Sequence, residues 1–322
     1  QGAAAGRAAS LPQGVAAARG AAVDAKTGLP TRVVHRASGV TLVLIPAGEF
    51  VMGSADSEEG RTDEERRHRR VVRSPFYLGE TEVTVAQFRR FVRAARYLTD
   101  AERGTPDGGH ARGAFSAVAG GDREWNRRAS WRNAFPNFRD YRPRESHPVV
   151  HVSWNDARRF ASHYGLSLPT EAQWEYAHRA GGAARFPWGD READGAGRGN
   201  VADASGARRF PSWNMLFTFD DGAALVAAAG SYRANAWGLR DMTGNVQEWC
   251  EDAYLADYPA DGADESAARA RTDDVDAQRV LRGGSWLDGP QQTRSAARAA
   301  MRPSARRDFI GFRVALRLGL RR

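Results

Sequence analysis

Glycine and proline place the strongest constraint on how this chain can fold. Thirty-four glycines and fourteen prolines interrupt its 322 residues, and both residue types end helices and mark turns. The pattern therefore favours a loop-rich globule over a helical bundle. Nine tryptophans and fourteen phenylalanines argue against a disordered chain, which would be poor in aromatic residues. We expect one α+β domain with little regular secondary structure.

The charge of the chain is basic but evenly spread. The formal net charge is +8, and Lys26 is the only lysine among 47 basic residues. Nucleic-acid-binding surfaces usually cluster basic residues among stacking aromatics, whereas here acidic residues are interleaved with the arginines. We interpret the arginine content as a coding bias and expect no nucleic-acid partner. No run approaches eighteen apolar residues, so we expect no membrane-spanning segment.

The single cysteine, Cys250, excludes an intramolecular disulfide and a cysteine-rich metal site. Residues 1–28 are rich in alanine, glycine and arginine without apolar periodicity, which indicates a flexible leader. Together with a first strand this leader fills residues 1–37, and residues 38–322 form a single domain. A Gln at the N-terminus is ordinary after removal of an export signal. Export to the bacterial periplasm or envelope is therefore a hypothesis.

Local patterns predict short strands and helices. Thr84 and Thr170 each precede a glutamine by three residues, as in a capping box, and Asn155 or Asp156 can cap a helix that follows Trp154. The acidic stretch 58–65 is interpreted as a solvated loop face. The predicted elements are strands over 32–35 and 40–45, helices beginning at Thr84, after Trp154 and after Pro169, and a last strand over 312–318.

Several segments match one protein family together and in the same order. They are Met52-Gly53-Ser54, Glu82-Val83-Thr84, HPVVHVSW at 147–154, LPTEAQWEYA at 168–177, FPWG at 186–189, NAWGL at 235–239, GNVQEW at 244–249, RGGSW at 282–286 and GFR at 311–313. With these segments the chain resembles the formylglycine-generating enzyme (sulfatase-modifying factor) family over roughly residues 38–318. The resemblance implies an elaborated C-type-lectin-like α+β fold with little regular secondary structure.

Calcium is the cofactor that the residues and the resemblance suggest, as one or two ions. Irregular backbone with carboxylate, amide and carbonyl oxygens suits a hard cation, although Asp-Gly pairs by themselves mostly make turns. The resemblance implies one site at Asn200, Val201 (carbonyl), Asp221 and Ala223 (carbonyl). It implies a second at Asp241, Gly244 (carbonyl), Val246 (carbonyl) and Glu248, with Asp241 in place of the family's common Asn.

The chemistry of the family's active members is missing from this chain. Those enzymes bind copper(I) through two cysteines that follow the Gly-Gly-Ser motif, because copper(I) requires soft thiolates. Residues 283–298 contain no cysteine, and Asp288 or Gly289, with Gln291 or Gln292, occupy that region. We therefore expect no copper and no cysteine-to-formylglycine oxidation. Cys250 is expected to be a small buried residue.

The segment that follows Gly-Gly-Ser lines the family's cleft and supplies a candidate surface for a ligand or partner. Asp288, Gln291 and Gln292 are its best candidates for a changed binding site. Trp286 and Arg298 belong to the same segment, but the resemblance also gives both a structural interpretation. No catalytic residue is assigned.

Three functions follow from the resemblance. The first is a catalytically degenerate, calcium-stabilised binding or regulatory protein of the bacterial envelope with a protein partner, similar to the exported regulator of the threonine-phosphorylation pathway of type VI secretion. The second is a periplasmic oxidoreductase-type tailoring enzyme with a replaced active site, similar to the relative that acts on the pyoverdine chromophore, with Asp288 or Glu248 as candidate carboxylates. The third, an authentic formylglycine-generating oxidase, is disfavoured by the missing thiols.

Overall fold

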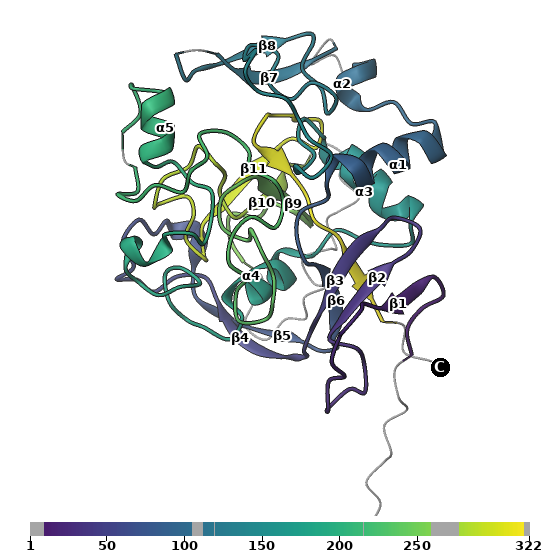
Figure 1. Ribbon diagram of the computed structural model, residues 1–322. Helices are drawn as coiled ribbons and strands as arrows, with labels where there is room; N and C mark the ends of the chain where they lie inside the picture. The colour runs from purple at the N-terminus through teal and green to yellow at the C-terminus, as the bar shows by residue number, and fades with distance from the viewer. Residues whose placement is uncertain (1–9, 105–111, 119, 215, 259–276, 319–322) are drawn as a thin grey trace, which may run out of the picture.

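The computed structural model describes residues 10–104, 112–118, 120–214, 216–258 and 277–318. The first and last strands of the chain share an antiparallel five-stranded sheet, at the lower right of Figure 1. Its order is β1 (Val15–Ala17), β2 (Arg32–His35), β3 (Val40–Ile45), β6 (Phe76–Gly79) and β13 (Ala315–Arg317). The predicted strands over 32–35 and 40–45 are confirmed. The short strand β1 lies within the stretch that the sequence analysis treated as a leader, and it pairs with β2.

A second sheet occupies the centre of the molecule (Figure 1). Its order is β11 (Arg298–Met301), β10 (Arg279–Arg282), β9 (Gln247–Ala253) and β12 (Ile310–Gly311), and β12 runs parallel to β9. Two hairpins complete the described strands: β4 (Gly48–Met52) with β5 (His68–Val72), and β7 (Ala114–Ala117) with β8 (Arg123–Asn126). The predicted last strand over 312–318 is shortened to β13, because residues 312–314 lead from β12 in the second sheet to β13 in the first.

Short capped helices join the strands. They are α1 (Val85–Ala95), α2 (Asp100–Arg103), α3 (Trp154–His163), α4 (Glu171–Arg179) and α5 (Ala204–Arg209), with single 3-10 turns at 63–65 and 192–195. The capping boxes at Thr84 and Thr170 form as predicted. The predicted cap of α3 is wrong by two or three residues: Ser153 caps it, because its hydroxyl accepts from Asp156 N–H while the Asp156 carboxylate accepts from Ser153 N–H.

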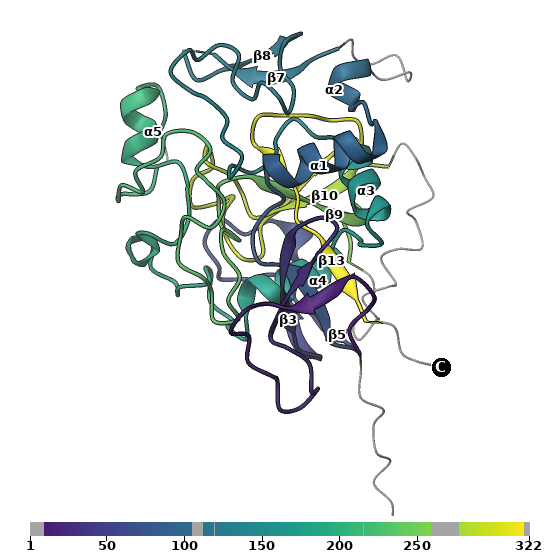
Figure 2. The ribbon, with the colours of Figure 1, turned by 45° about the vertical axis from the view of Figure 1, so that its right-hand side comes forward.

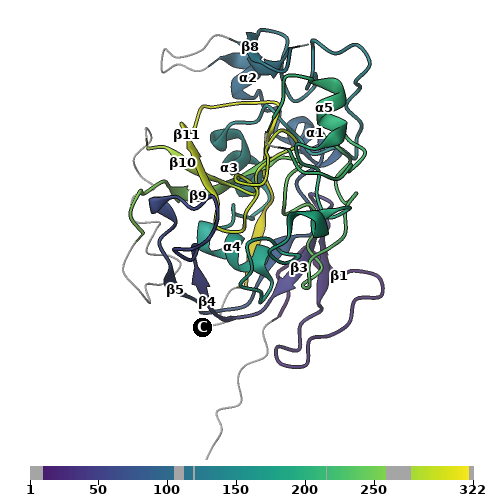
Figure 3. The same cartoon turned by 90° about the vertical axis from the view of Figure 1, so that its left-hand side faces the viewer.

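Helix α4 is the most enclosed of the described helices, and all nine of its residues are buried. It contacts the β4–β5 hairpin on one side and strands β9 and β10 on the other (Figure 3). Its charged residues are buried as ion pairs: Glu175 accepts from Arg179 at 2.8 Å and also pairs with Arg282 of β10. Buried charges of this kind persist where each has a partner.

Helices α1 and α3 pack against each other beside the second sheet (Figure 2). Their contact is built from aromatic rings, with Phe88, Phe91 and Phe160 within 6.0 Å of one another between centroids. Phe312 completes the cluster from the last segment of the chain. Within the described ranges, no helix combines the length and the apolar character that crossing a bilayer requires. The architecture is a mixed α+β domain rich in loops, as predicted.

Candidate functional site

The segment that follows strand β10 begins with a turn that depends on glycine. Gly283 and Gly284 have φ angles of 97° and 65°. A Cβ built on Gly283 would lie 3.0 Å from the ring of Trp174, so a side chain there would strain both the backbone and the helix α4 that carries this ring. The turn leads Ser285 and Trp286 into the interior, where both are buried.

The resemblance described above implies that Asp288 lies in the region in which the family's active members carry a thiol. The Ser285 hydroxyl donates a hydrogen bond of 2.6 Å to the Asp288 carboxylate, and the Asp288 N–H donates to the Ser285 carbonyl at 3.0 Å. Burial raises the pKa of Asp288 above its ordinary value, against the opposing effects of the Ser285 hydrogen bond and the charge of Arg123. The position therefore holds a hard, oriented oxygen donor, which is not a ligand that copper(I) prefers.

A cation lies beside this carboxylate. The Arg123 guanidinium stacks over the rings of Trp286 and Phe309, at 5.7 and 5.0 Å from the ring centroids, and its Nε is 3.4 Å from a carboxylate oxygen of Asp308. Asp308 is buried, and burial raises its pKa. Arg123 thus contributes positive charge to two buried or half-buried carboxylates, Asp288 and Asp308. Neither Arg123 nor Asp308 lies in a recognisable sequence motif, so neither was predicted as a site residue.

Gln291 and Gln292 are exposed on the loop that follows Asp288. This loop is held at its end by Arg294, which is buried and forms two hydrogen bonds of 2.7 Å to the Glu65 carboxylate. A further bond of 2.7 Å joins Arg294 to Glu58. The interpretation of residues 58–65 as a solvated face is therefore wrong for Glu65, which is buried as the partner of Arg294.

Trp286 and Arg298 are occupied by contacts within the protein. The Trp286 ring lies 5.7 Å from that of Phe135 and 5.8 Å from that of Trp213. The Arg298 guanidinium donates to both oxygens of Glu171, at 2.6 and 2.9 Å, and its side chain is 2% exposed. Of the five residues assigned to a binding surface, the structure thus leaves Gln291 and Gln292 exposed and Asp288 half-buried.

The residues of the first expected calcium site lie close together. The two carboxylate oxygens of Asp221 accept hydrogen bonds from the N–H groups of Val201 and Ala223, each at 2.8 Å. Asn200 is fully buried. Its amide nitrogen donates to the Leu225 carbonyl at 2.9 Å, whereas its side-chain oxygen has no hydrogen-bond partner. A buried amide oxygen without a donor is an atom that a cation could satisfy.

A second carboxylate, which the sequence analysis missed, lies beside this group. Asp203 is fully buried and accepts hydrogen bonds from the N–H groups of Ser205 and Asp221. Burial raises the pKa of Asp221 to about 7 and also raises that of Asp203. No ion pair to either carboxylate is formed by the described residues. The group therefore carries negative charge that a hard divalent cation would balance.

The residues of the second expected calcium site lie near the guanidinium of Arg313. Asp241 and Glu248 both face Arg313, and Glu248 also accepts a hydrogen bond of 2.8 Å from the Trp174 indole. Glu82, which had not been assigned to a site, is the third carboxylate of this group. It is buried, one of its oxygens has no partner, and burial together with the charge of Asp241 raises its pKa well above the ordinary value. Three carboxylates thus share one cation.

The two expected calcium sites adjoin each other. The Asn245 N–H donates to the Asn200 carbonyl at 2.6 Å, and Asn200 forms a β-bridge with Gly244. A side chain on Gly244 would clash with that carbonyl, so glycine is required for this approach. Val246, the remaining member of the second group, is buried at the start of the segment that leads into β9.

The donor chemistry of both groups fits calcium, since every expected donor is a carboxylate, amide or carbonyl oxygen. The part of the chain that the structure describes contains no group of three or more histidine, cysteine, aspartate or glutamate side chains disposed to hold a metal ion. Each site would therefore need main-chain carbonyls to complete its ligand set. The residues that would supply them are Val201 and Ala223 in the first group, and Gly244 and Val246 in the second.

Comparison with known proteins identifies the family of the chain. Residues 29–318 match the family model of the sulfatase-modifying factor enzyme 1-like domain. The chain belongs to this family. It is 39% identical over 289 residues to the formylglycine-generating enzyme of Streptomyces coelicolor, covering 85% of this chain and 88% of the relative. It is 32% identical over 292 residues to the inactive C-alpha-formylglycine-generating enzyme 2 of Bos taurus, covering 86% and 88%.

Among solved structures, the chain is similar to PvdO from Pseudomonas aeruginosa, with 26% identity and a TM-score of 0.64 over 87% of this chain and 95% of that one. Membership of the sulfatase-modifying factor family confirms the resemblance and the fold that were inferred from the sequence. The family contains both active and inactive members. A sequence whose only cysteine is Cys250 cannot supply a copper-binding thiol pair, so formylglycine generation is not supported.

Proposed function

We propose that this protein is a catalytically degenerate member of the family that binds a protein partner in the bacterial envelope and acts there as a regulator. The observation that carries the proposal is the replacement of the thiol region by Asp288, held by Ser285, and by the exposed Gln291 and Gln292. An envelope partner, of the kind that regulates type VI secretion through threonine phosphorylation, fits the resemblance. A nucleic-acid partner is not part of the proposal.

The loop that carries the two glutamines has the properties of a recognition surface. Glutamine side chains offer two donors and an acceptor without charge, and here they project from a loop whose end is fixed by the buried pair of Arg294 and Glu65. A loop that is already ordered before binding loses little conformational entropy when a partner docks. Rigid surroundings with exposed polar tips are typical of loops that recognise ligands.

Calcium has a structural role in this proposal. Asn200, Asp221 and the carbonyls of Val201 and Ala223 would hold one ion, and Asp241, Glu248 and the carbonyls of Gly244 and Val246 a second. The support is the unpartnered Asn200 oxygen and the excess of buried carboxylates over cations in both groups. A bound cation would lower the cost of burying these charges. It would also fix loops that have little regular secondary structure of their own.

Differential capture tests the partner-binding function. The wild type, Q291R/Q292R and Q13R are immobilised and exposed to envelope extract of the source bacterium. Gln13 is also exposed but lies on the β1 side of the molecule, so Q13R controls for a single positive charge added away from the loop. We expect one protein to be retained by the wild type and by Q13R and lost by Q291R/Q292R. Equal retention by all three proteins, or retention by none, contradicts the proposal.

A second candidate function is the tailoring enzyme with a replaced active site, and the properties of Asp288 favour it. The pKa of this carboxyl group is raised by burial, and a guanidinium lies nearby. Carboxyl groups with raised pKa values serve as general acids or bases. Turnover of an envelope metabolite that is lost in D288A, while the circular dichroism spectrum is retained, would support this function over the regulatory one.

A further inference from the structure

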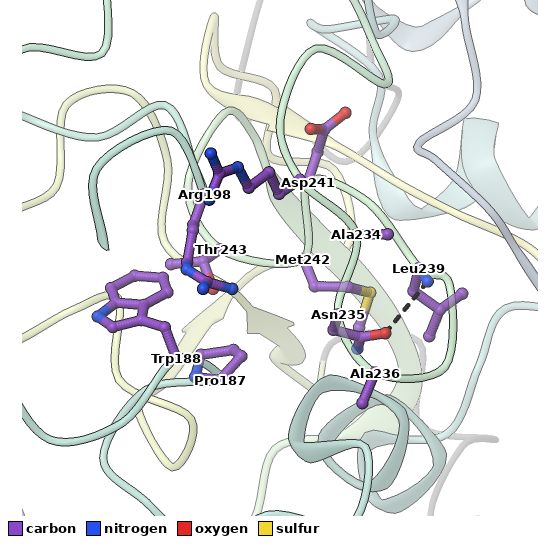
Figure 4. Close-up of a pocket in the computed structure, with 11 residues that line it drawn as sticks. Pro187, Trp188, Arg198, Ala234, Asn235, Ala236, Leu239, Asp241, Met242 and Thr243 are labelled. Carbon is purple, nitrogen blue, oxygen red and sulfur yellow. Dashed lines mark hydrogen bonds between the residues drawn. The ribbon is translucent and has the colours of Figure 1, made fainter. Parts of the chain in front are cut away.

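A pocket separate from the Asp288 loop lies beside the turn that precedes Gly244 (Figure 4). Its volume is about 320 Å³, which falls within the range of small-molecule sites. It shares no residue with the segment 283–298. The lining residues are Pro187, Trp188, Arg198, Arg233, Ala234, Asn235, Ala236, Leu239, Asp241, Met242 and Thr243.

Two arginines of this pocket have charges that nothing nearby neutralises. Among the residues that the structure describes, neither the Arg198 nor the Arg233 guanidinium forms a hydrogen bond or an ion pair. By contrast, Arg294 and Arg298 each hold a carboxylate. The two unpaired arginines start from adjacent points, because the Arg233 N–H donates to the Gly197 carbonyl at 3.1 Å. Two neighbouring guanidinium groups without a counter-ion favour an anion.

The one carboxylate that lines the pocket does not supply this counter-ion. The oxygens of Asp241 accept hydrogen bonds from the N–H groups of Gly230 and Tyr232. In Figure 4 its carboxylate points away from Pro187 and Trp188. It therefore leaves the side of the pocket with Trp188 and Arg198 free for a ligand.

The apolar walls beside the charges are fixed. Trp188 stacks on Phe186 with ring centroids 4.9 Å apart and an interplanar angle of 5°, and its indole N–H donates to the Arg191 carbonyl at 3.1 Å. A side chain on Gly195 would collide with the Trp188 ring, so the indole has close contact on that edge too. Leu239 and Met242, both buried, complete the apolar lining.

The polar side chains at the rim of the pocket are also held in place by hydrogen bonds. Both donors and the acceptor of the Asn235 side chain are used by backbone groups, including the Ala177 carbonyl at 2.8 Å and the Trp237 N–H at 3.0 Å. The Thr243 hydroxyl is 2.9 Å from the ring nitrogen of His178. In this pocket the arginines are therefore the side chains that remain available for new charge-assisted hydrogen bonds.

We propose that this pocket binds a small organic anion. Its phosphate, sulfate or carboxylate group would lie against Arg198 and Arg233, and its flat apolar part against Trp188. The proposal does not depend on the partner-binding function, because the pocket and the Gln291–Gln292 loop share no residue. It assigns a site to a region that the sequence analysis had connected only with calcium through Asp241.

Ligand-observed saturation-transfer NMR tests the proposal with phenyl phosphate, phenyl sulfate and benzoate, and with benzyl alcohol as the neutral probe. We expect saturable binding of at least one anion by the wild type and none of the alcohol. R198A/R233A should bind at least about ten-fold more weakly, since each charge-assisted hydrogen bond contributes strongly to affinity. R67A/R128A removes the same charge from two exposed arginines outside the pocket and should bind like the wild type.

Two further results distinguish specific binding of an anion in this pocket from non-specific attraction of anions to a basic protein. W188A should weaken phenyl phosphate while leaving competition by inorganic phosphate unchanged, because only the organic probe uses the ring. Since the Arg198 and Arg233 guanidinium groups form no hydrogen bond or ion pair within the described protein, R198A/R233A should melt like the wild type. Equal binding by R198A/R233A and R67A/R128A, or no saturable binding by the wild type, would overturn the proposal.

Discussion

Arg313 and Glu248 form a two-point ion pair in which both side chains are buried, with Nε–Oε2 and Nη2–Oε1 distances of 2.7 Å. The same guanidinium donates to the carbonyls of Gly79, at 2.9 Å, and of Arg240, at 3.0 Å. One side chain therefore joins strand β9, the end of strand β6 and the turn that precedes Asp241. This pair connects the group proposed to bind calcium with the core of the domain.

Replacing Arg313 by methionine should destabilise the protein strongly. The substitution leaves Glu248 buried without its cation, which typically costs about 3–5 kcal/mol in free energy of unfolding. R313K should lose less, because lysine keeps the charge but cannot form the two-point contact. Urea denaturation followed by circular dichroism measures the difference.

R317A is the matched control for this prediction. Arg317 pairs with Glu251 at 2.7 Å, but its side chain is 41% exposed, so its loss should cost about 1 kcal/mol or less. Equal destabilisation by R313M and R317A would show that the buried pair contributes no more to the free energy of unfolding than the exposed pair.

Removing calcium should lower the melting temperature. An ion present at 100 times its dissociation constant stabilises the folded state by about 2.7 kcal/mol. For a domain of this size the expected decrease in melting temperature on chelation is about 4 °C for each site. Differential scanning calorimetry in excess calcium and in excess chelator measures it.

D221N separates the two expected calcium sites. It removes a charge from the first group only, so its melting temperature should still fall on chelation, but by less than that of the wild type. Identical melting of the wild-type protein in calcium and in chelator would reject both sites.

The sequence predicts those parts of the fold that local interactions determine. Helices α1 and α4 begin at Thr84 and Thr170 because each threonine and its glutamine satisfy one another's backbone groups over three residues. Strands β2 and β3 follow from two short runs rich in valine and other apolar residues on either side of the Ser38-Gly39 turn. Such patterns are complete within a few residues, so they can be recognised without knowing the fold.

The parts that could not be predicted depend on partners far away in the chain. Glu65 looks like any acidic loop residue, but its partner Arg294 lies 229 residues later. Glu82 and Arg313 both lie in family motifs, yet no sequence pattern shows that they lie together with Asp241 and Glu248. Asp203 lies in no motif, and only the folded chain brings it to Asp221. These contacts form only when distant segments are brought together by the fold, so no local pattern in the sequence reveals them.

The stability of the protein should depend on pH through Asp156. Burial and the neighbouring Asp100 raise the pKa of this carboxyl to about 7, whereas an aspartate in an unfolded chain has a pKa of about 3.9. Between these values the folded state binds more protons than the unfolded state. The contribution is therefore fully present below about pH 4 and is lost as the pH rises to about 7.

D156N tests this dependence. Its side chain cannot titrate, although it keeps an acceptor for the Tyr97 hydroxyl, which donates to Asp156 at 2.8 Å in the wild type. The decrease in free energy of unfolding from pH 4 to pH 7 should be smaller in D156N than in the wild type. D122N changes an exposed carboxylate and should retain the wild-type profile. Parallel profiles for D156N and the wild type would contradict the assignment to Asp156.

The wild-type protein should bind no stoichiometric copper(I) and should not convert cysteine to formylglycine in a peptide. Cys250 is fully buried, and burial raises the pKa of its thiol well above the ordinary value, so the thiolate that copper requires is scarce. Anaerobic titration against a chromophoric copper(I) chelator, with mass spectrometry of the peptide, measures both properties. C250S should match the wild type in both assays. Copper that binds the wild type and is lost in C250S would show that the thiol becomes accessible, and oxidation of the peptide would restore the oxidase function that the missing thiol pair argues against.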